Sequence, residues 1–122
     1  MKTPKRGEIW IVNLDPTVGS EISKKRPAVI ISNDINNVNA DTVTVIPVTS
    51  STQKIYPFEI ALPAGVGGLK HDSKAKANQI RTIDKRRLTQ SIGTLAAKDM
   101  AELERAISIH LDMGGETTGI AE

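Results

Sequence analysis

Lys24-Lys25-Arg26-Pro27 runs directly into Ala28-Val29-Ile30-Ile31-Ser32, and this is the most informative stretch of the chain. Three cations end a polar loop that contains Gly and Ser, and a proline then begins an apolar strand rich in β-branched residues. Such a strand is predicted to lie in the core. The cation beside it, Arg26, is therefore expected at the rim of a rigid core, where it can hold a phosphate.

Short strands are predicted on both sides of this segment, because runs rich in β-branched residues alternate with residues typical of turns. They are expected at residues 7–15, 27–32, 42–48, 55–62, 74–82 and 90–95. Residues 33–41 have the composition of a loop, and residues 84–88 are typical of one helical turn with Asp84 as its cap. Pro47 indicates an edge or bulged position, because proline cannot donate to a ladder.

The last element differs from the others, because its apolar residues recur at helical spacing. Residues 98–113 carry this pattern at Met100, Leu103, Ile107 and Leu111, and Gly114-Gly115 follows as a stop. Short strands and one closing helix predict a mainly β fold with a C-terminal helix, as a compact barrel or curled sheet. One domain over residues 1–115 and a flexible tail over residues 116–122 are expected.

Composition limits the class of protein. The 122 residues include no cysteine, and no apolar run approaches the roughly 20 residues that span a bilayer. No signal-peptide pattern follows the charged N-terminus. A cytoplasmic protein without a membrane segment is the simplest interpretation. Residues 1–95 hold 14 Lys/Arg and 8 Asp/Glu, whereas residues 96–122 hold 2 and 6, so the body is basic and the C-terminal segment acidic. A basic body suits a polyanionic partner, and ordinary surface charge explains it equally well.

Several chemistries find no support in the sequence. Only Trp10, Tyr56 and Phe58 are aromatic, too few for a stacking platform that binds several bases. His71 and His110 have no partner at metal-ligand spacing, and His110 is expected to pack with the apolar face of the final helix. The carboxylates are scattered, which argues against a two-metal nuclease. No metal and no cofactor are therefore expected.

The strands at residues 27–32 and 42–48 form a candidate hairpin. If the loop centres near Val38, Pro27 lies opposite Thr49 and Arg26 opposite Ser50. Cross-strand neighbours lie about 4.5–5.5 Å apart, so a guanidinium and two hydroxyls are predicted to share one end of the sheet as a phosphate or oxyanion site. The simpler alternative pairs Arg26 with a carboxylate and leaves Thr49 to cap a turn.

A second basic cluster follows in Gln79-Ile80-Arg81-Thr82-Ile83-Asp84-Lys85-Arg86-Arg87-Leu88. Gln79 and Arg81 are expected to project from the same strand face, and an amide with a guanidinium suits base edges or phosphates. A solvated strand face followed by a charged turn is the alternative.

Five blocks of this sequence together resemble the MazF/PemK toxin family. They are Arg6-Gly7-Glu8-Ile9-Trp10, Asp15-Pro16-Thr17-Val18-Gly19-Ser20-Glu21, Lys25-Arg26-Pro27 through Asp34, Pro47-Val48-Thr49-Ser50 and Gln79 through Leu88. The blocks occur in the family's order and spacing over roughly residues 5–112. Val48 stands where isoleucine is commoner, and His71-Asp72-Ser73 replaces the usual Gly/Arg-Asp-Ser and extends the basic rim.

The resemblance implies an SH3-like barrel of the MazF/CcdB type, a homodimer, and a metal-independent, sequence-specific endoribonuclease that a cognate antitoxin inhibits. It places the catalytic roles on Arg26 and Thr49. Residues expected to bind single-stranded RNA are Ser20, Glu21, Lys24, Lys25, Ser50, Gln79 and Arg81. Glu21 is a candidate to orient Arg26, or else a solvated glutamate.

Under this hypothesis the RNA 2′-OH attacks the adjacent phosphorus, so the nucleophile belongs to the substrate and no metal is needed. Arg26 would stabilise the developing charge, and Thr49 would orient a phosphate oxygen. The main alternative is a non-enzymatic toxin that binds DNA gyrase, like the CcdB proteins with their related barrel. A third is an interaction module that keeps the barrel and has lost activity.

Overall fold

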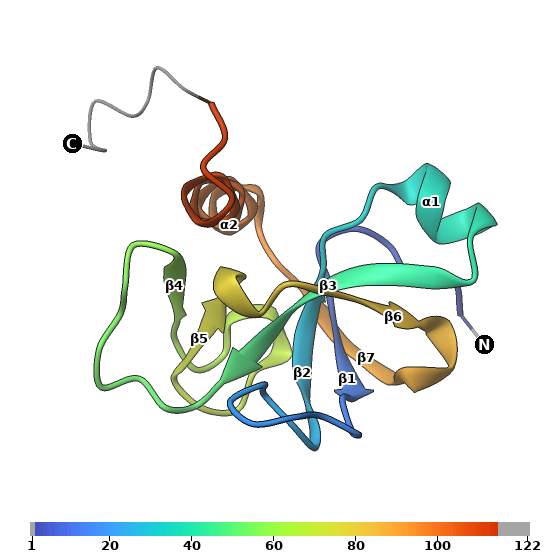
Figure 1. Cartoon of the computed structure of the whole chain (residues 1–122), viewed down its shortest axis with the longest axis horizontal. Coiled ribbons are helices and arrows are strands. Elements are labelled where there is room, and N and C mark those ends of the chain that lie inside the picture. The colour runs from blue at the N-terminus through green and yellow to red at the C-terminus, as the bar shows by residue number, and fades with distance from the viewer. Residues whose placement is uncertain (1, 115–122) are drawn as a thin grey trace.

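A computed structural model describes residues 2–114 and shows a curled antiparallel sheet covered by one long helix (Figure 1). The strands are β1 (Glu8–Asn13), β2 (Lys25–Ile30), β3 (Thr42–Thr49), β4 (Glu59–Leu62), β5 (Ser73–Lys76), β6 (Arg81–Asp84) and β7 (Leu88–Thr94). The helices are α1 (Asp34–Asn39) and α2 (Ala97–His110), with 3₁₀ turns at Val66–Gly68, Ala77–Gln79 and Lys85–Arg87. The predicted tail at residues 116–122 lies outside the described residues.

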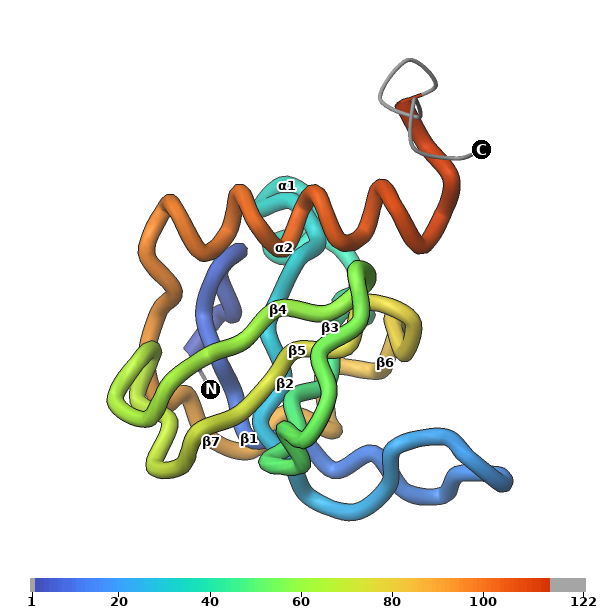
Figure 2. Tube along the Cα trace, turned by 90° about the vertical axis from the view of Figure 1, so that its left-hand side faces the viewer, coloured from blue at the N-terminus to red at the C-terminus, as the bar shows by residue number. Residues whose placement is uncertain are grey.

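The strands follow the order β4-β5-β3-β2-β1-β7, and β6 pairs with β3 beside this path. The mainly β fold with a C-terminal helix is thus confirmed. Within the described residues the end strands β4 and β7 do not pair with each other, so the sheet is curled and open rather than closed. Figure 2 shows α2 across one end of the sheet, while the β1–β2 loop extends from the opposite end.

Strand β3 is the centre of the sheet. It pairs with β2 on one side, and on the other with β6 up to Val45 and with β5 from Val48 onward. Pro47 lies in the break between these two pairings. Proline lacks a backbone N–H and is tolerated at such a break, so the irregular position predicted for Pro47 is confirmed.

Three predicted elements differ from those observed. Residues 33–41, which were expected to form a loop, contain helix α1. Asn33 stabilises the start of this helix, because its side chain accepts a hydrogen bond from the Asn36 N–H at 2.8 Å. Residues 55–58 precede β4 rather than belong to it. The single strand predicted at residues 74–82 is two strands, and the register against β3 shifts by the three residues of the turn between them. The cap by Asp84 is confirmed, since its side chain accepts from the Arg86 N–H.

Both faces of the curled sheet are buried, which explains the nearly continuous apolar runs in β1 and β2. One cluster includes Ile9, Val29 and Ile46 and receives Leu103 and Ala106 from α2. The other cluster is formed by residues that alternate with these along the strands, among them Trp10, Val12, Leu14, Ala28, Ile30, Val43 and Val45. Helix α2 ends at His110, which is exposed and is not part of the core, although its ring lies 6.4 Å from that of Phe58. No helix in residues 2–114 is both long and apolar enough to cross a membrane.

A buried ion pair fastens the β3–β4 connection. The Glu59 side chain is 1% exposed, and its carboxylate accepts hydrogen bonds from the Tyr56 N–H at 2.9 Å and from Lys74 Nζ at 3.0 Å. Lys74 Nζ also donates to the Lys54 carbonyl. Burial alone would raise the pKa of Glu59, but these hydrogen bonds and the charges of Lys74 and Lys76 together lower it below its ordinary 4.5.

Replacing Glu59 with glutamine should lower the free energy of unfolding at pH 7 by about 3 kcal/mol, because Lys74 is left as an unpaired buried cation. A lowered pKa means that Glu59 stabilises the fold above about pH 4.5, and that this contribution is lost as pH falls through the folded value. The variant should therefore lose less stability than the wild type on acidification. Urea unfolding at pH 7 and below pH 4.5 measures both effects.

The matched control is Glu104→Gln. Glu104 pairs with Arg6 at 3.0 Å on the surface and is 54% exposed, so its loss should cost less than about 1 kcal/mol. Equal losses at both positions, or identical acid dependence of Glu59→Gln and the wild type, would contradict the assignment.

Candidate functional site

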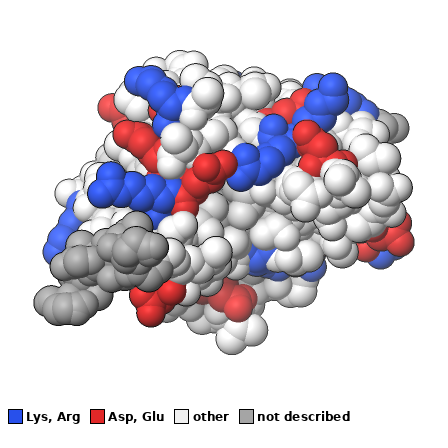
Figure 3. All heavy atoms as spheres, turned by 90° about the horizontal axis from the view of Figure 1, so that it is seen from above, with Lys and Arg blue, Asp and Glu red and all other residues white. Residues whose placement is uncertain are grey.

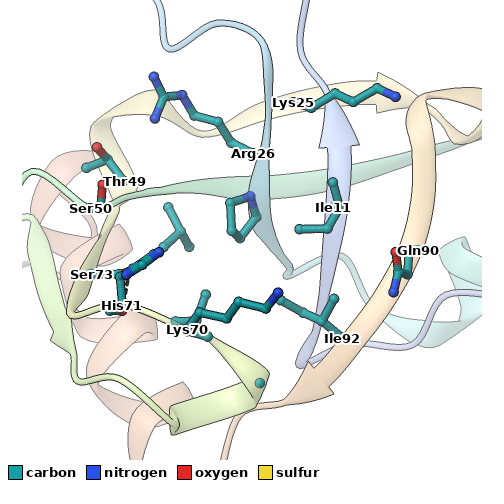
Figure 4. A pocket seen from close by; sticks show the side chains of 14 residues that line it. Ile11, Lys25, Arg26, Thr49, Ser50, Lys70, His71, Ser73, Gln90 and Ile92 are labelled. Carbon is teal, nitrogen blue, oxygen red and sulfur yellow. Dashed lines mark hydrogen bonds between the residues drawn. The ribbon is translucent and has the colours of Figure 1, made fainter.

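A cavity of about 370 Å³ opens where β2 begins and β3 ends (Figure 4). Its walls come from both of these strands, from β1 and β7, and from the segment before β5. The lining residues are Ile11, Lys25, Arg26, Pro27, Val48, Thr49, Ser50, Gly68, Leu69, Lys70, His71, Ser73, Gln90 and Ile92. The predicted pair Arg26 and Thr49 is thus brought into one cavity, together with Lys25 and Ser50.

Arg26 is the second residue of β2 and is half-buried. Its Nε donates to the Ser23 carbonyl at 2.8 Å, and this bond fixes the side chain at the edge of the cavity. Figure 4 shows the guanidinium on the same side of the cavity as Thr49 and Ser50. The partner of Nε is thus a carbonyl in a local turn, and not the carboxylate that the simpler alternative required.

Thr49 is the last residue of β3 and is also half-buried. Its Oγ1 accepts from the Ser51 N–H at 3.2 Å, which leaves the hydroxyl hydrogen to donate to an anion. The Thr49 side chain can therefore cap the turn, as the simpler alternative required, and also contact a phosphate.

The hairpin register differs by one residue from the prediction. Ala28 pairs with Pro47 and Ile30 with Val45, and the same register continued brings Arg26 level with Thr49 instead of Ser50. The midpoint of the β2–β3 connection does not predict the register correctly, because helix α1 occupies much of this connection. The length of the connection is therefore set by the helix and not by a symmetric turn. The slip moves the two proposed catalytic residues closer along the strands than predicted.

Gln79 and Arg81 hold the β1–β2 loop. The Gln79 side chain accepts from the Ile22 N–H at 3.2 Å and donates to the Ser20 carbonyl at 3.5 Å. Arg81 Nη1 donates to the Leu14 carbonyl at 3.2 Å. They line a separate cavity of about 360 Å³ with Glu21, Asn78 and Ile80. The prediction of one strand face for both is wrong, since Gln79 lies in a 3₁₀ turn and Arg81 begins β6.

The other predicted loop residues lie around this anchored segment. Glu21 accepts from the Val18 N–H at 2.8 Å, a contact within its own turn, whereas Arg26 Nε donates to Ser23. The proposed orienting role of Glu21 is therefore not what is observed. Lys24 is exposed with a positive φ of 71°, and its carbonyl accepts from the Leu14 N–H, which closes the base of the loop.

Sequence reasoning missed one wall of the cavity. Lys70 and His71 enter from the segment before β5, and Gln90 enters from β7. The sequence places His71 only on a basic rim, and it gives Lys70 and Gln90 no signal beyond ordinary polarity. These residues are far from Arg26 along the chain, and only the pairing of β7 with β1 and of β5 with β3 brings them to it.

The cavity is positively charged. Lys25, Arg26 and Lys70 line it, and none of its lining residues is Asp or Glu. The visible face that carries α2, by contrast, mixes both signs of charge (Figure 3). In the part of the chain that the structure describes, no group of three or more His, Cys, Asp or Glu could hold a metal ion. The arrangement of fixed cations and hydroxyls suits a phosphate.

Comparison with known proteins agrees with this geometry. Residues 5–111 match the model of the PemK-like, MazF-like toxin of type II toxin-antitoxin systems. Endoribonuclease MazF9 of Mycobacterium tuberculosis is 47% identical over 114 residues, which cover 89% of this chain and 97% of the relative. The crystal structure of MazF from Deinococcus radiodurans (Form-I) superposes with a TM-score of 0.81 at 29% identity, covering 93% of this chain and 100% of that one. A MazE-MazF structure from the same organism (Form-II) gives a TM-score of 0.74 at 27% identity, with the same coverage.

Proposed function

The chain belongs to the PemK-like, MazF-like toxins of type II toxin–antitoxin systems, and we propose that it is an endoribonuclease that cleaves single-stranded RNA at specific sequences. The observation that carries the proposal is the positively charged cavity shared by Arg26 and Thr49. The Mycobacterium tuberculosis relative at 47% identity is named an endoribonuclease, which favours this activity over gyrase binding.

The proposed reaction is an internal phosphoryl transfer. The 2′ oxygen of the nucleotide before the cut attacks the adjacent phosphorus, and the bond from phosphorus to the 5′ oxygen breaks. The products are a 2′,3′-cyclic phosphate and a 5′-hydroxyl, and we propose that no metal takes part because the substrate supplies the nucleophile. Arg26 stabilises the charge that develops on the phosphoryl oxygens, since a guanidinium keeps its positive charge and acts as a hydrogen-bond donor rather than as a base. Thr49 orients one of those oxygens.

The RNA-binding residues divide into two groups under this proposal. Lys25 and Ser50 line the cavity and contact the phosphates beside the cut. Ser20, Glu21, Lys24, Gln79 and Arg81 act through the β1–β2 loop, whose shape they hold and whose outer surface faces the RNA. Sequence preference would then depend on this loop.

We further propose a homodimer and a cognate antitoxin as partners, and action in the cytoplasm, where RNA is the substrate. The dimer is supported by apolar side chains at the end of α2 that are exposed in the single chain, namely Ile109, Leu111 and Met113. The antitoxin is supported by the MazE-MazF structure of the similar Deinococcus protein.

The test of the activity uses purified protein, a mixed-sequence RNA and excess EDTA. Cleavage should continue in chelator, and the new 3′ ends should carry the mass of a cyclic phosphate. An oligonucleotide with a single 2′-deoxy nucleotide before the cut should stay intact at that position, because it lacks the nucleophile. Intact RNA under all conditions, or equal cutting of the deoxy substrate, would refute the proposal.

A further inference from the structure

One side chain in the cavity, His71, has chemistry that the proposed cleavage of RNA leaves unused, and its role depends on that proposed function. Attack by a 2′-OH needs a group that removes its proton. Arg26, Lys25 and Lys70 are donors when charged, and Thr49 and Ser50 are weak acids. His71 also lines the cavity, and a neutral imidazole has a nitrogen lone pair that accepts a proton in the neutral range.

Two hydrogen bonds hold the backbone at His71 and at the residues that follow it. The Ser73 hydroxyl donates to the His71 carbonyl at 2.8 Å. The Asp72 carboxylate accepts a hydrogen bond from the Ala64 N–H at 2.9 Å, so this carboxylate next to His71 binds the preceding loop. Ser73 itself begins β5, the strand that pairs with the end of β3. A residue fixed in this way has a defined position relative to Thr49.

The imidazole lies among cations and hydroxyls. Figure 4 shows His71 on the side of the cavity that holds Ser50 and Thr49, across from Ile11 and Gln90. The charged groups that line the same cavity are Lys25 and Arg26 from β2 and Lys70 from its own segment. These cations attract the substrate phosphate to the cavity that the imidazole lines, while the side chain keeps access to solvent.

We propose that His71 is the general base of the cleavage reaction. Its imidazole takes the proton from the 2′-OH as the 2′ oxygen bonds to phosphorus, and the leaving 5′ oxygen takes a proton from water when its bond to phosphorus breaks. Arg26 and Thr49 hold the phosphoryl oxygens during this transfer. The imidazolium then releases its proton to solvent, and no other reactant is needed.

The experiment compares His71→Ala with His110→Ala, since the chain has two histidines and His110 lies on α2 outside the cavity. Cleavage of an RNA oligonucleotide is followed under single-turnover conditions from pH 5 to pH 9. His71→Ala should lower the rate at pH 7.5 by about 10²-fold or more, within the usual contribution of a general base. It should also abolish the rise of the rate through the neutral range, and added imidazole should restore part of it. His110→Ala should match the wild type.

Two further measurements separate catalysis from binding and from folding. The dissociation constant of a 2′-deoxy substrate analogue should change less than about threefold in His71→Ala, because its phosphates still meet the cations. His71→Gln keeps the size and polarity of the side chain without a basic nitrogen, so it should be as slow as His71→Ala with an unchanged unfolding midpoint.

The outcomes are distinct. A wild-type protein that cuts RNA with the same pH profile as His71→Ala would overturn the role of His71 and leave the proposed nuclease intact. A fall in activity accompanied by an equal fall in affinity would assign His71 to phosphate binding and equally overturn the proposal. A wild type that cuts no RNA would instead refute the proposed function itself.

Discussion

Replacing Arg26 with alanine should lower kcat/KM for RNA cleavage by about 10²–10³-fold, as expected when a donor to a developing oxyanion is removed. The side chain is half-buried and fixed through Nε to the Ser23 carbonyl, so its geometry exists before the substrate arrives. Preorganised charge of this kind stabilises the transition state more than the ground state. The loss should therefore appear mainly in kcat, which single-turnover cleavage measures.

Two variants serve as comparison for Arg26→Ala. Arg26→Lys keeps the charge but loses the planar fork, so it should recover only a small part of the activity. Lys25→Ala removes the neighbouring exposed cation, and should weaken RNA binding in a salt-dependent way with a much smaller effect on kcat. Full activity of Arg26→Ala, with folding verified by circular dichroism, would remove Arg26 from the mechanism.

Replacing Gly68 with alanine should lower the free energy of unfolding by about 3 kcal/mol or more, through strain and overpacking together. Gly68 has a φ of +83°, and an added Cβ would lie 2.0 Å from the Ile92 carbonyl oxygen of β7. The backbone must therefore move at this contact. Because Lys70 and His71 follow within three residues, RNA cleavage should fall as well. Urea unfolding and the single-turnover assay measure the two effects.

The matched control for Gly68→Ala is Gly65→Ala. Gly65 has a similar φ of +95°, but no atom lies within 4 Å of the position that its Cβ would take. This variant bears the cost of the left-handed conformation alone, about 1 kcal/mol. Equal destabilisation at both positions would show that the close approach to β7 contributes nothing.

Local sequence determined much of the fold. The β-branched runs predicted the positions of β1, β2, β3 and β7, since such residues favour extended backbone wherever they are half or fully buried. The cap at Asp84 was predictable from the sequence, because its hydrogen bond with the Arg86 N–H joins residues only two positions apart. The polar composition of residues 33–41 led to the wrong prediction of a loop where α1 lies, because asparagine caps a helix, as Asn33 does, as readily as it forms a turn.

The site was only partly visible in the sequence. Lys24-Lys25-Arg26-Pro27 placed a cation at the start of a buried strand, and the hairpin placed Thr49 near it, because both depend on neighbouring elements of the chain. The role of Gln79 and Arg81 in holding the β1–β2 loop was decided by contacts that join residues far apart in the chain, 57 and 67 positions for the bonds to Ile22 and Leu14.

The sequence alone predicted most of the strands, the position of the final helix, and that Arg26 and Thr49 lie at the same end of a hairpin. The register, the break between β5 and β6, and the position of Lys70, His71 and Gln90 in the cavity became known only from the three-dimensional structure. The physical reason is that propensity and capping act over a few residues. Cavity walls, in contrast, arise from the curl of the whole sheet, which brings β5 and β7 to the end of β2 and β3.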